Sequence, residues 1–256
     1  MPPKNGGYHP IESIFQQVNL YDEIKIELSQ EGKDVVEYFD SNNIRICIDN
    51  CIIKKVLNYY FRRKDPYFRI VVKKNIPMGS GLGGASSNAA VVIQFLKKEG
   101  LISTVNMLDI ASKIGADVPF FIKGGRCFVE GIGERVFESH VQKRDVYLVI
   151  VPPLHIATKE IYNALDRVAT YSSFGDFNKE CLDYLNDFKD IIWVKYPIYQ
   201  RIESVLSKFG LPLYLSGTGA SCYLPLKNKG DIDFYGLNRD LYQYFPHLKI
   251  YNLHSL

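Results

Sequence analysis

A run of glycines and small polar residues lies between a predicted strand and a predicted helix. It reads Pro77-Met78-Gly79-Ser80-Gly81-Leu82-Gly83-Gly84-Ala85-Ser86-Ser87-Asn88. Glycines let a backbone approach phosphate oxygens, and a helix start offers unpaired amides with a partial positive charge. The serines add hydroxyl donors, Ser86 or Asn88 could assist the helix start, and Lys73 and Lys74 precede the run. The run is therefore predicted to bind phosphate, in preference to a turn whose glycines serve only packing.

Three nucleotide-binding motifs compete for this run. Gly79, Gly81 and Gly84 satisfy the dinucleotide pattern G-x-G-x-x-G, but no acidic residue closes a second strand at the required distance. The Walker pattern needs G-K-[ST] after its glycines, and protein kinases need H-R-D and D-F-G segments; the sequence has none of these. A lone G-x-G-x-x-G is weak support, so the ligand has to be inferred from the rest of the chain.

Hydrophobic periodicity predicts a mixed α/β chain in two halves. In the first half we expect strands within 14–28 and over 68–72, and helices over 51–61, 85–100 and 103–115, the last with Ser103 as its N-cap. A strand over 146–151 ends at a proline pair, and we place a domain boundary before it, giving domains 1–145 and 146–256. Beyond it we expect helices over 159–165, 198–209 and 237–244, and strands over 211–215, 221–226 and 248–253. Residues 172–195 give no clear pattern.

Bulk composition limits the class of protein. The 256 residues are 46% hydrophobic and 23% charged, and the net charge of +3 lacks the concentrated basic stripe of a nucleic-acid binder. No stretch reaches the roughly 18 apolar residues of a membrane span, and the first residues lack an apolar signal-peptide core. Five scattered cysteines form no CxxC pair, and no histidines cluster with cysteines or carboxylates. We expect a cytoplasmic protein with a small-molecule substrate, no nucleic-acid or membrane partner, and no dedicated metal ligands.

Several further segments occur in a set order along the chain. They are Gly7-Tyr8-His9, then 114–121 (I-G-A-D-V-P-F-F), 131–134 (G-I-G-E), 152–158 (P-P-L-H-I-A-T) and 216–222 (S-G-T-G-A-S-C). Together with the glycine-rich run, they resemble the GHMP kinase superfamily and, more narrowly, its 4-diphosphocytidyl-2-C-methyl-D-erythritol kinase family. The resemblance is collinear from Gly7 to about Leu226.

The resemblance implies a fold and a reaction. The fold class is α+β, a two-domain GHMP kinase fold with an N-terminal mixed α/β domain that carries the phosphate loop and a C-terminal ferredoxin-like α/β domain. The reaction is ATP-dependent phosphorylation of the 2-hydroxyl of cytidyl-diphospho-methylerythritol, with magnesium present, in the non-mevalonate isoprenoid pathway.

The resemblance also assigns roles to residues near the phosphate loop. Asp117 matches the catalytic aspartate, which can accept the proton of the attacking hydroxyl or orient it toward the γ-phosphate. Without the family match, Asp117 would be read as the cap of a turn or helix. Asn50 and Lys74 match positions near the nucleotide base, and Pro77 to Ser87 form the ATP loop.

Substrate contacts are implied at three further positions. Tyr8 and His9 match positions that hold the cytosine end, where an aromatic ring can stack and an imidazole can hydrogen-bond. Thr158 matches a substrate-contacting position. The segment Gly217-Thr218-Gly219 is expected to pack against the phosphate loop or the substrate, or to serve only as a hairpin turn.

One family segment has no counterpart in this sequence. Family members carry a strand of the type P-A-K-I-N-L before G-Y-H, and its lysine is the second catalytic residue. Here Met1 lies six residues before Gly7, and Lys4 is a substitute by residue type only. We expect either that the chain as given starts too late, or that it is a truncated, catalytically impaired nucleotide-binding relative. A GHMP kinase for another small alcohol is a further alternative, against which Tyr8 and His9 argue.

Overall fold

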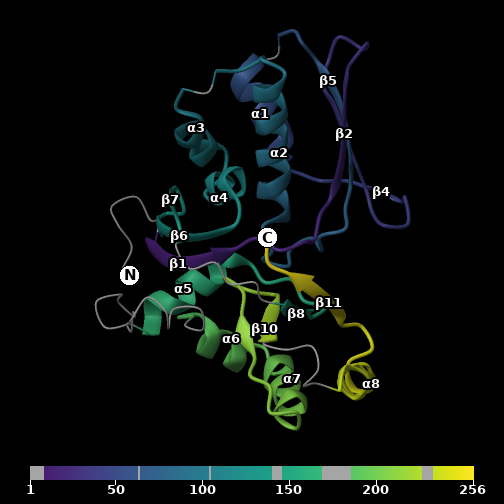
Figure 1. The fold of residues 1–256 in the computed structure, drawn as a ribbon, viewed down its shortest axis with the longest axis vertical. Coiled ribbons are helices and arrows are strands. Elements are labelled where there is room, and N and C mark those ends of the chain that lie inside the picture. The colour runs from purple at the N-terminus through teal and green to yellow at the C-terminus, as the bar shows by residue number, and fades with distance from the viewer. Residues whose placement is uncertain (1–8, 63, 104, 140–145, 169–185, 227–232) are drawn as a thin grey trace.

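Both halves of the chain contain helices and strands (Figure 1). The structure is a computed structural model that describes residues 9–62, 64–103, 105–139, 146–168, 186–226 and 233–256. The proposed substrate residue Tyr8, and Lys4, lie outside the described residues.

Two sheets form the strand framework of the N-terminal half. A three-stranded antiparallel sheet has the order β1-β6-β7, with β1 at Ile11–Gln16, β6 at Arg126–Gly131 and β7 at Arg135–Glu138. A four-stranded sheet has the order β2-β5-β3-β4, with β2 at Glu23–Leu28, β5 at Phe68–Lys73, β3 at Val35–Phe39 and β4 at Arg45–Ile46. In this sheet β3 runs parallel to β5, and the other neighbours are antiparallel.

Four helices accompany these sheets: α1 (Ile52–Phe61), α2 (Gly84–Lys98), α3 (Met107–Ile114) and α4 (Val118–Lys123). Alternate residues of β5, including Ile70 and Val72, are fully buried and belong to one core with Ile53 of α1 and Ile93 of α2. The period of two in β5 and the helical period in α1 and α2 direct both apolar faces to this core. This shared core positions β5 and α2, and the phosphate loop connects the end of β5 to the start of α2.

The C-terminal half has its own sheet, helices and core. Its antiparallel sheet has the order β11-β8-β10-β9, with β8 at Val146–Val151, β9 at Tyr214–Leu215, β10 at Cys222–Leu226 and β11 at Lys249–His254. The helices are α5 (Thr158–Val168), α6 (Lys189–Lys195), α7 (Ile198–Ser207) and α8 (Phe234–Tyr244). This strand order, with helices between the strands, is the expected ferredoxin-like arrangement. The separate cores of the two halves support our proposal of a boundary before β8.

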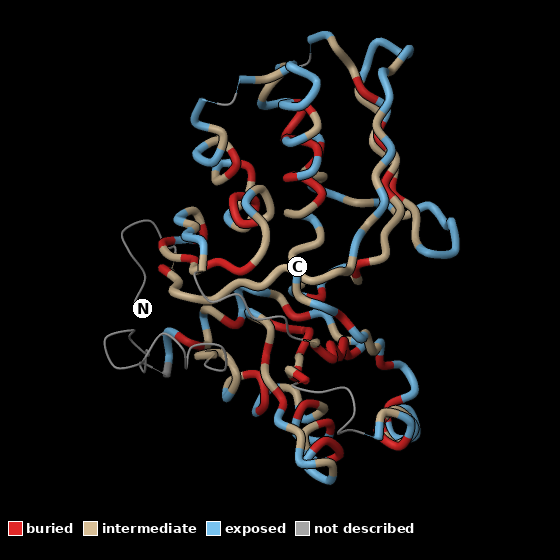
Figure 2. The backbone as a smooth tube through the Cα atoms, viewed as in Figure 1, coloured by how far each residue is buried: buried red, intermediate tan, exposed pale blue. Residues whose placement is uncertain are grey.

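The two halves are joined by the last residues of the chain. Val18 and Ser255 form an isolated antiparallel bridge, and the Leu256 amide donates to the Gln17 carbonyl at 3.0 Å. The Asn19 amide also donates to the His254 carbonyl at 3.0 Å. The C-terminus consequently lies where the halves meet (Figure 1), and buried stretches occur in both halves on either side of it (Figure 2).

Most elements expected from the periodicity are present, but two details are wrong. Ser103 is not the N-cap of α3: that position is Asn106 at φ 58°, while the Ser103 hydroxyl accepts from the Val105 amide at 3.2 Å in a preceding turn. The strand expected over 211–215 has only two residues, because Pro212 has no amide to donate to a strand ladder. The periodicity also missed the helices α4 and α6 and the strands β3, β4, β6 and β7. None of the helices in the described ranges has the length and apolar character to cross a bilayer.

Replacing Ile70 with alanine should lower the free energy of unfolding by about 2–5 kcal/mol, because the fully buried side chain would leave a cavity against α2. Urea denaturation measures this change. Leu28→Ala is the matched control, because Leu28 lies on the neighbouring strand of the same sheet and is 70% exposed. Equal losses in the two variants would contradict the proposed core.

Candidate active site

A cleft with a volume of about 1690 Å³ is lined by residues of both halves. It exceeds the roughly 300–1,000 Å³ of ordinary small-molecule pockets, so it has room for two ligands. The lining includes every described member of the predicted site: His9, Asn50, Lys74, Pro77, Met78, Gly79, Ser80, Gly81, Leu82, Gly83, Gly84, Ala85, Ser86, Ser87, Asp117 and Thr158. Lys73, the other lysine before the loop, does not line it.

The phosphate loop leads directly into α2. The N-cap of α2 is Gly83 at φ 69°, with no side-chain capping bond, so the amides of the first turn have no intrahelical acceptor. The expectation that Ser86 or Asn88 assists the helix start is therefore wrong, and the Asn88 amide group instead donates to Asp22 at 2.9 Å. The Ser80 hydroxyl donates to the Pro77 carbonyl at 2.7 Å within the loop. Backbone amides are thus the main donors that the loop presents to a ligand.

The segment 216–222 packs against the phosphate loop, as one of its two expected roles requires. The Ser221 amide donates to the Ser80 carbonyl at 2.9 Å. A Cβ atom on Gly81, which has φ 75°, would overlap the Gly219 carbonyl oxygen. The hydroxyl oxygens of Thr158 and Thr218 lie 3.2 Å apart, which joins the start of α5 to the same segment. The C-terminal half therefore contacts the loop at Ser80 and Gly81.

Asp117 occupies the N-cap position of α4 but makes no side-chain capping bond. The alternative role of a helix cap is therefore not realised. The turn 131–134 packs beside it: a Cβ atom on Gly133 would lie 2.8 Å from the Ala116 carbonyl oxygen, and the Glu134 carboxylate accepts from the Ile132 amide at 2.6 Å. Burial raises the pKa of Asp117 above its usual range, since desolvation penalises the charged form.

An aromatic cluster lies at another part of the cleft lining. The His9 and Tyr162 rings are stacked with centroids 4.7 Å apart, and Phe188 meets Tyr162 edge-on at 4.9 Å. His9 Nε2 lies 3.3 Å from the Asp166 carboxylate. Burial and, to a lesser degree, the negative charge of Asp117 raise the pKa of Tyr162, and both residues line the cleft. Sequence periodicity gave no signal for Tyr162 or Phe188, because isolated aromatic residues are more often part of a core.

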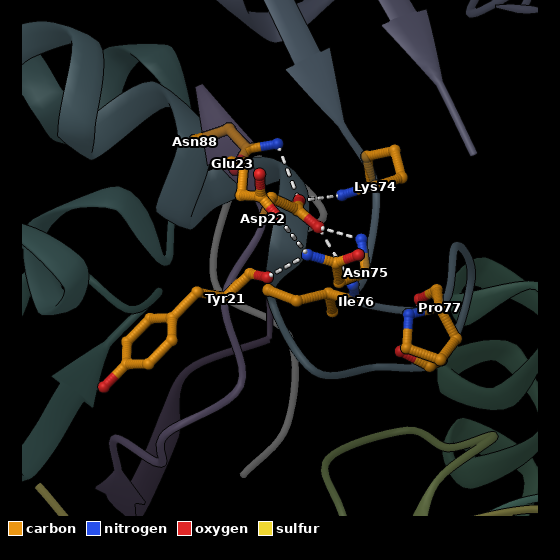
Figure 3. A network of polar contacts seen from close by, with 9 residues as sticks. Tyr21, Asp22, Glu23, Lys74, Asn75, Ile76, Pro77 and Asn88 are labelled. Carbon is orange, nitrogen blue, oxygen red and sulfur yellow. Dashed lines mark hydrogen bonds and ion pairs between the residues drawn. The ribbon is translucent and has the colours of Figure 1, made fainter. Parts of the chain in front are cut away.

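Lys74 and Asn50 line the cleft in different ways. The Lys74 ammonium is ion-paired with the fully buried carboxylate of Asp22, in a network that continues to Asn88 (Figure 3). Asn50 is exposed and has a left-handed backbone conformation, with φ 52°. Asp22 had no role in the sequence prediction, although its carboxylate contacts residues on both sides of the phosphate loop.

The overall structure is similar to solved GHMP kinases. It aligns with a crystal structure of 4-(cytidine 5'-diphospho)-2C-methyl-D-erythritol kinase at a TM-score of 0.75 and 21% identity, covering 99% of this chain and 93% of that one. It aligns with homoserine kinase from Cytophaga hutchinsonii ATCC 33406 at a TM-score of 0.70 and 15% identity, covering 95% and 89%. Residues 51–125 match the family described as GHMP kinases N terminal domain. The fold, with its glycine-rich loop at a cleft between two αβ halves, is that of a GHMP kinase.

Sequence relatives narrow the class. The chain is 35% identical over 234 residues to the 4-diphosphocytidyl-2-C-methyl-D-erythritol kinase of Blochmanniella pennsylvanica (strain BPEN), covering 87% of this chain and 77% of that one. It is 32% identical over 240 residues to the enzyme of the same name from Persephonella marina (strain DSM 14350 / EX-H1), covering 89% and 86%. The chain belongs to the 4-diphosphocytidyl-2-C-methyl-D-erythritol kinase family.

Gly81→Ala should loosen the contact between the loop and the C-terminal half, because the added methyl group overlaps the Gly219 carbonyl. We expect a lower melting temperature and faster hydrogen exchange at the Ser221 amide. Gly100→Ala is the matched control: its φ of 70° imposes similar backbone strain, but its Cβ would meet no atom within 4 Å. If both variants lost the same stability, backbone strain alone would account for the effect.

Asp117→Asn should raise stability at pH 7. The pKa of this carboxyl is higher in the folded state than in the unfolded state. The contribution of the Asp117 carboxyl to the stability of the wild-type protein is therefore fully present below about pH 4 and is lost as the pH rises through the folded-state pKa. The neutral amide removes the cost of a buried charge. Urea unfolding of both proteins between pH 4 and pH 7 should show a gain for the variant that shrinks toward pH 4. A gain that is independent of pH would contradict this account.

Proposed function

We propose that this protein transfers the γ-phosphoryl group of ATP to the 2-hydroxyl of 4-diphosphocytidyl-2-C-methyl-D-erythritol. The observation that carries the proposal is the meeting of three features in one cleft. These are the phosphate loop, the partly buried carboxylate of Asp117, and the aromatic cluster of His9, Tyr162 and Phe188. The first suits a nucleoside triphosphate, the second an attacking hydroxyl, and the third a flat base.

The phosphate loop would hold the triphosphate mainly through its backbone. The amides of the first turn of α2 lack intrahelical acceptors, and the helix start adds a partial positive charge. Ser86 and Ser87 lie in that same turn and line the cleft, so their hydroxyls can add hydrogen bonds. Lys74 adds less net charge than a free lysine, because Asp22 neutralises it. Preorganised amides of this kind stabilise the charge that spreads over the transferred phosphoryl group.

Asp117 would act on the substrate hydroxyl. A carboxylate can accept the hydroxyl proton as the oxygen attacks the γ-phosphorus, or orient the hydroxyl for in-line attack. Desolvation raises the pKa of Asp117, so its carboxylate is a stronger base than that of an exposed aspartate and a better proton acceptor. The lack of a capping bond leaves its oxygens available.

The aromatic cluster would receive the cytosine. Ring stacking on a base contributes about 1–3 kcal/mol and requires an exposed aromatic face in the binding site. Tyr162 and Asp117 line the same cleft, so one substrate could extend from this end to the reacting end. We propose that Thr158, which contacts Thr218 beside the phosphate loop, helps to position the part of the substrate between the two ends.

Magnesium is part of the proposal, with ATP as its main ligand. Among the described residues no three histidine, cysteine or acidic side chains form a metal-binding group. A site of this kind fits Mg²⁺, which usually keeps several waters and binds substrate phosphates with only one or two carboxylates. Asp117 and the hydroxyls of Ser86 and Ser87 are among the cleft residues that could contribute. When bound, the ion would neutralise phosphate charge.

Asp117→Asn should lower the rate of ADP formation with the cytidyl substrate by on the order of 10²–10⁴-fold, while ATP binding changes little. Coupled ADP detection and equilibrium titration with ATP measure the two effects. Asp109→Asn, a neutralised carboxylate exposed on α3, is the control and should retain full turnover. Unchanged turnover in Asp117→Asn would remove the proposed base.

A substrate panel separates the alternatives. Turnover with the cytidyl substrate, and little with homoserine or mevalonate, is expected. Turnover with another alcohol in its place would identify a different substrate for the same cleft. Tight ATP binding with no transfer to any of the three would favour a nucleotide-binding protein that does not transfer phosphate.

A further inference from the structure

We infer that Asp22 is a positioning residue that fixes both ends of the phosphate loop and the ammonium of Lys74 in the arrangement that binds the nucleotide. The inference deepens the proposed function and rests on it for the identity of the ligand. The positioning itself depends only on the contacts of the described residues around Asp22.

The strand register brings Asp22 opposite the start of the loop. Glu23, the first residue of β2, pairs with Lys73, the last residue of β5, in antiparallel register. One step further along both strands, Asp22 faces Lys74, and the two side chains form an ion pair. Since side chains alternate between the two faces of a strand, Asp22 shares the face of Ile24 and Val72, which is directed to the core.

One carboxylate receives four donors. Its Oδ1 accepts from the amides of Asn75 at 2.8 Å and Ile76 at 2.9 Å. Its Oδ2 accepts from the Asn88 side chain at 2.9 Å and pairs with the Lys74 ammonium. Figure 3 shows these partners converging on Asp22 from the segment between β5 and the loop and from α2. A carboxylate offers about four acceptor sites, so this one is fully used.

The burial of this network favours a single arrangement of its side chains. The Asp22 side chain is 0% exposed and that of Lys74 is 8% exposed, while Asn88 is 2% exposed. A buried charge is costly unless it is paired and hydrogen-bonded, so the arrangement with all four donors in place is strongly preferred over any partial one. Asn75 and Ile76 directly precede Pro77, and Asn88 lies in the second turn of α2. The same carboxylate therefore ties down the backbone before the loop and the helix after it.

Lys74 is positioned by the same contact. A Cβ atom on Gly84 would lie 3.2 Å from the Lys74 ammonium, so the cation is beside the first residue of α2. An ammonium has three donors, and the bond to Asp22 leaves others for a ligand in the cleft that Lys74 lines. Without Asp22 the flexible lysine side chain would lose its anchor at this place.

Asp22→Asn tests the inference, because the amide has nearly the same size but cannot accept from four donors. Hydrogen exchange without nucleotide should become at least about tenfold faster for residues 75–87 and change less elsewhere. The dissociation constant and the KM for ATP should rise on the order of tenfold or more, with the KM for the alcohol within about twofold. Glu37→Gln is the matched control. It neutralises a 14%-exposed carboxylate that pairs with Arg69 and Arg45 on the same sheet, away from the loop, and both ATP constants should stay within about twofold.

Two results would overturn the inference: unchanged exchange and ATP affinity in Asp22→Asn, or exchange that accelerates equally over the whole domain. If Asp22→Asn does not fold, Asn88→Ala removes a single donor and should give the same local pattern to a smaller extent; no local change in that variant would also count against the inference. The exchange measurement needs no ligand. A wild-type protein that fails to bind ATP would thus contradict the proposed function, and the exchange data would still decide whether Asp22 positions the loop.

Discussion

The arrangement of the phosphate loop depends on contacts made by groups outside it. Its glycines lose more conformational freedom on folding than other residues, so the loop has little intrinsic preference for one shape. On the inner side, the buried Asp22 carboxylate binds the amides of Asn75 and Ile76 and the side chain of Asn88. On the outer side, the Ser221 amide binds the Ser80 carbonyl. The loop is thus held by contacts from both halves of the molecule.

This division explains why the cleft lies between two halves. Each half buries its own set of apolar side chains, a smaller cluster with Val18 and Tyr147 joins the two halves, and the cleft lies between them. The N-terminal half supplies the loop and Asp117, while residues of α5 and of the segment 216–222 line the cleft from the C-terminal half. The last residues of the chain pair with 17–19 and keep the two halves in contact.

Two carboxylates of the N-terminal half, the buried Asp22 and the partly buried Asp117, differ in how the cost of desolvating their charge is met. Asp22 is satisfied by four donors, which makes it a rigid structural anchor. Asp117 makes no capping bond, and its pKa is raised because desolvation is not compensated. The cost of desolvating the Asp117 charge also makes the carboxylate a stronger base, which is the property that its proposed role as proton acceptor requires. Other interactions in the fold have to offset this cost.

The sequence by itself determined the local elements and the motif residues. Strand β5, helices α1, α2 and α7, and the loop between β5 and α2 followed from apolar periodicity and glycine placement, and Asp117 followed from its family motif. Only the tertiary structure decided the role of Asp22, because nothing in its local sequence marks it and the antiparallel register of β2 and β5 places it opposite Lys74. The same holds for Tyr162 and Phe188, which meet His9 from about 150 to 180 residues further along the chain. Periodicity reports which side of an element is buried, whereas the partners across strands and between halves are set by packing over long sequence distances.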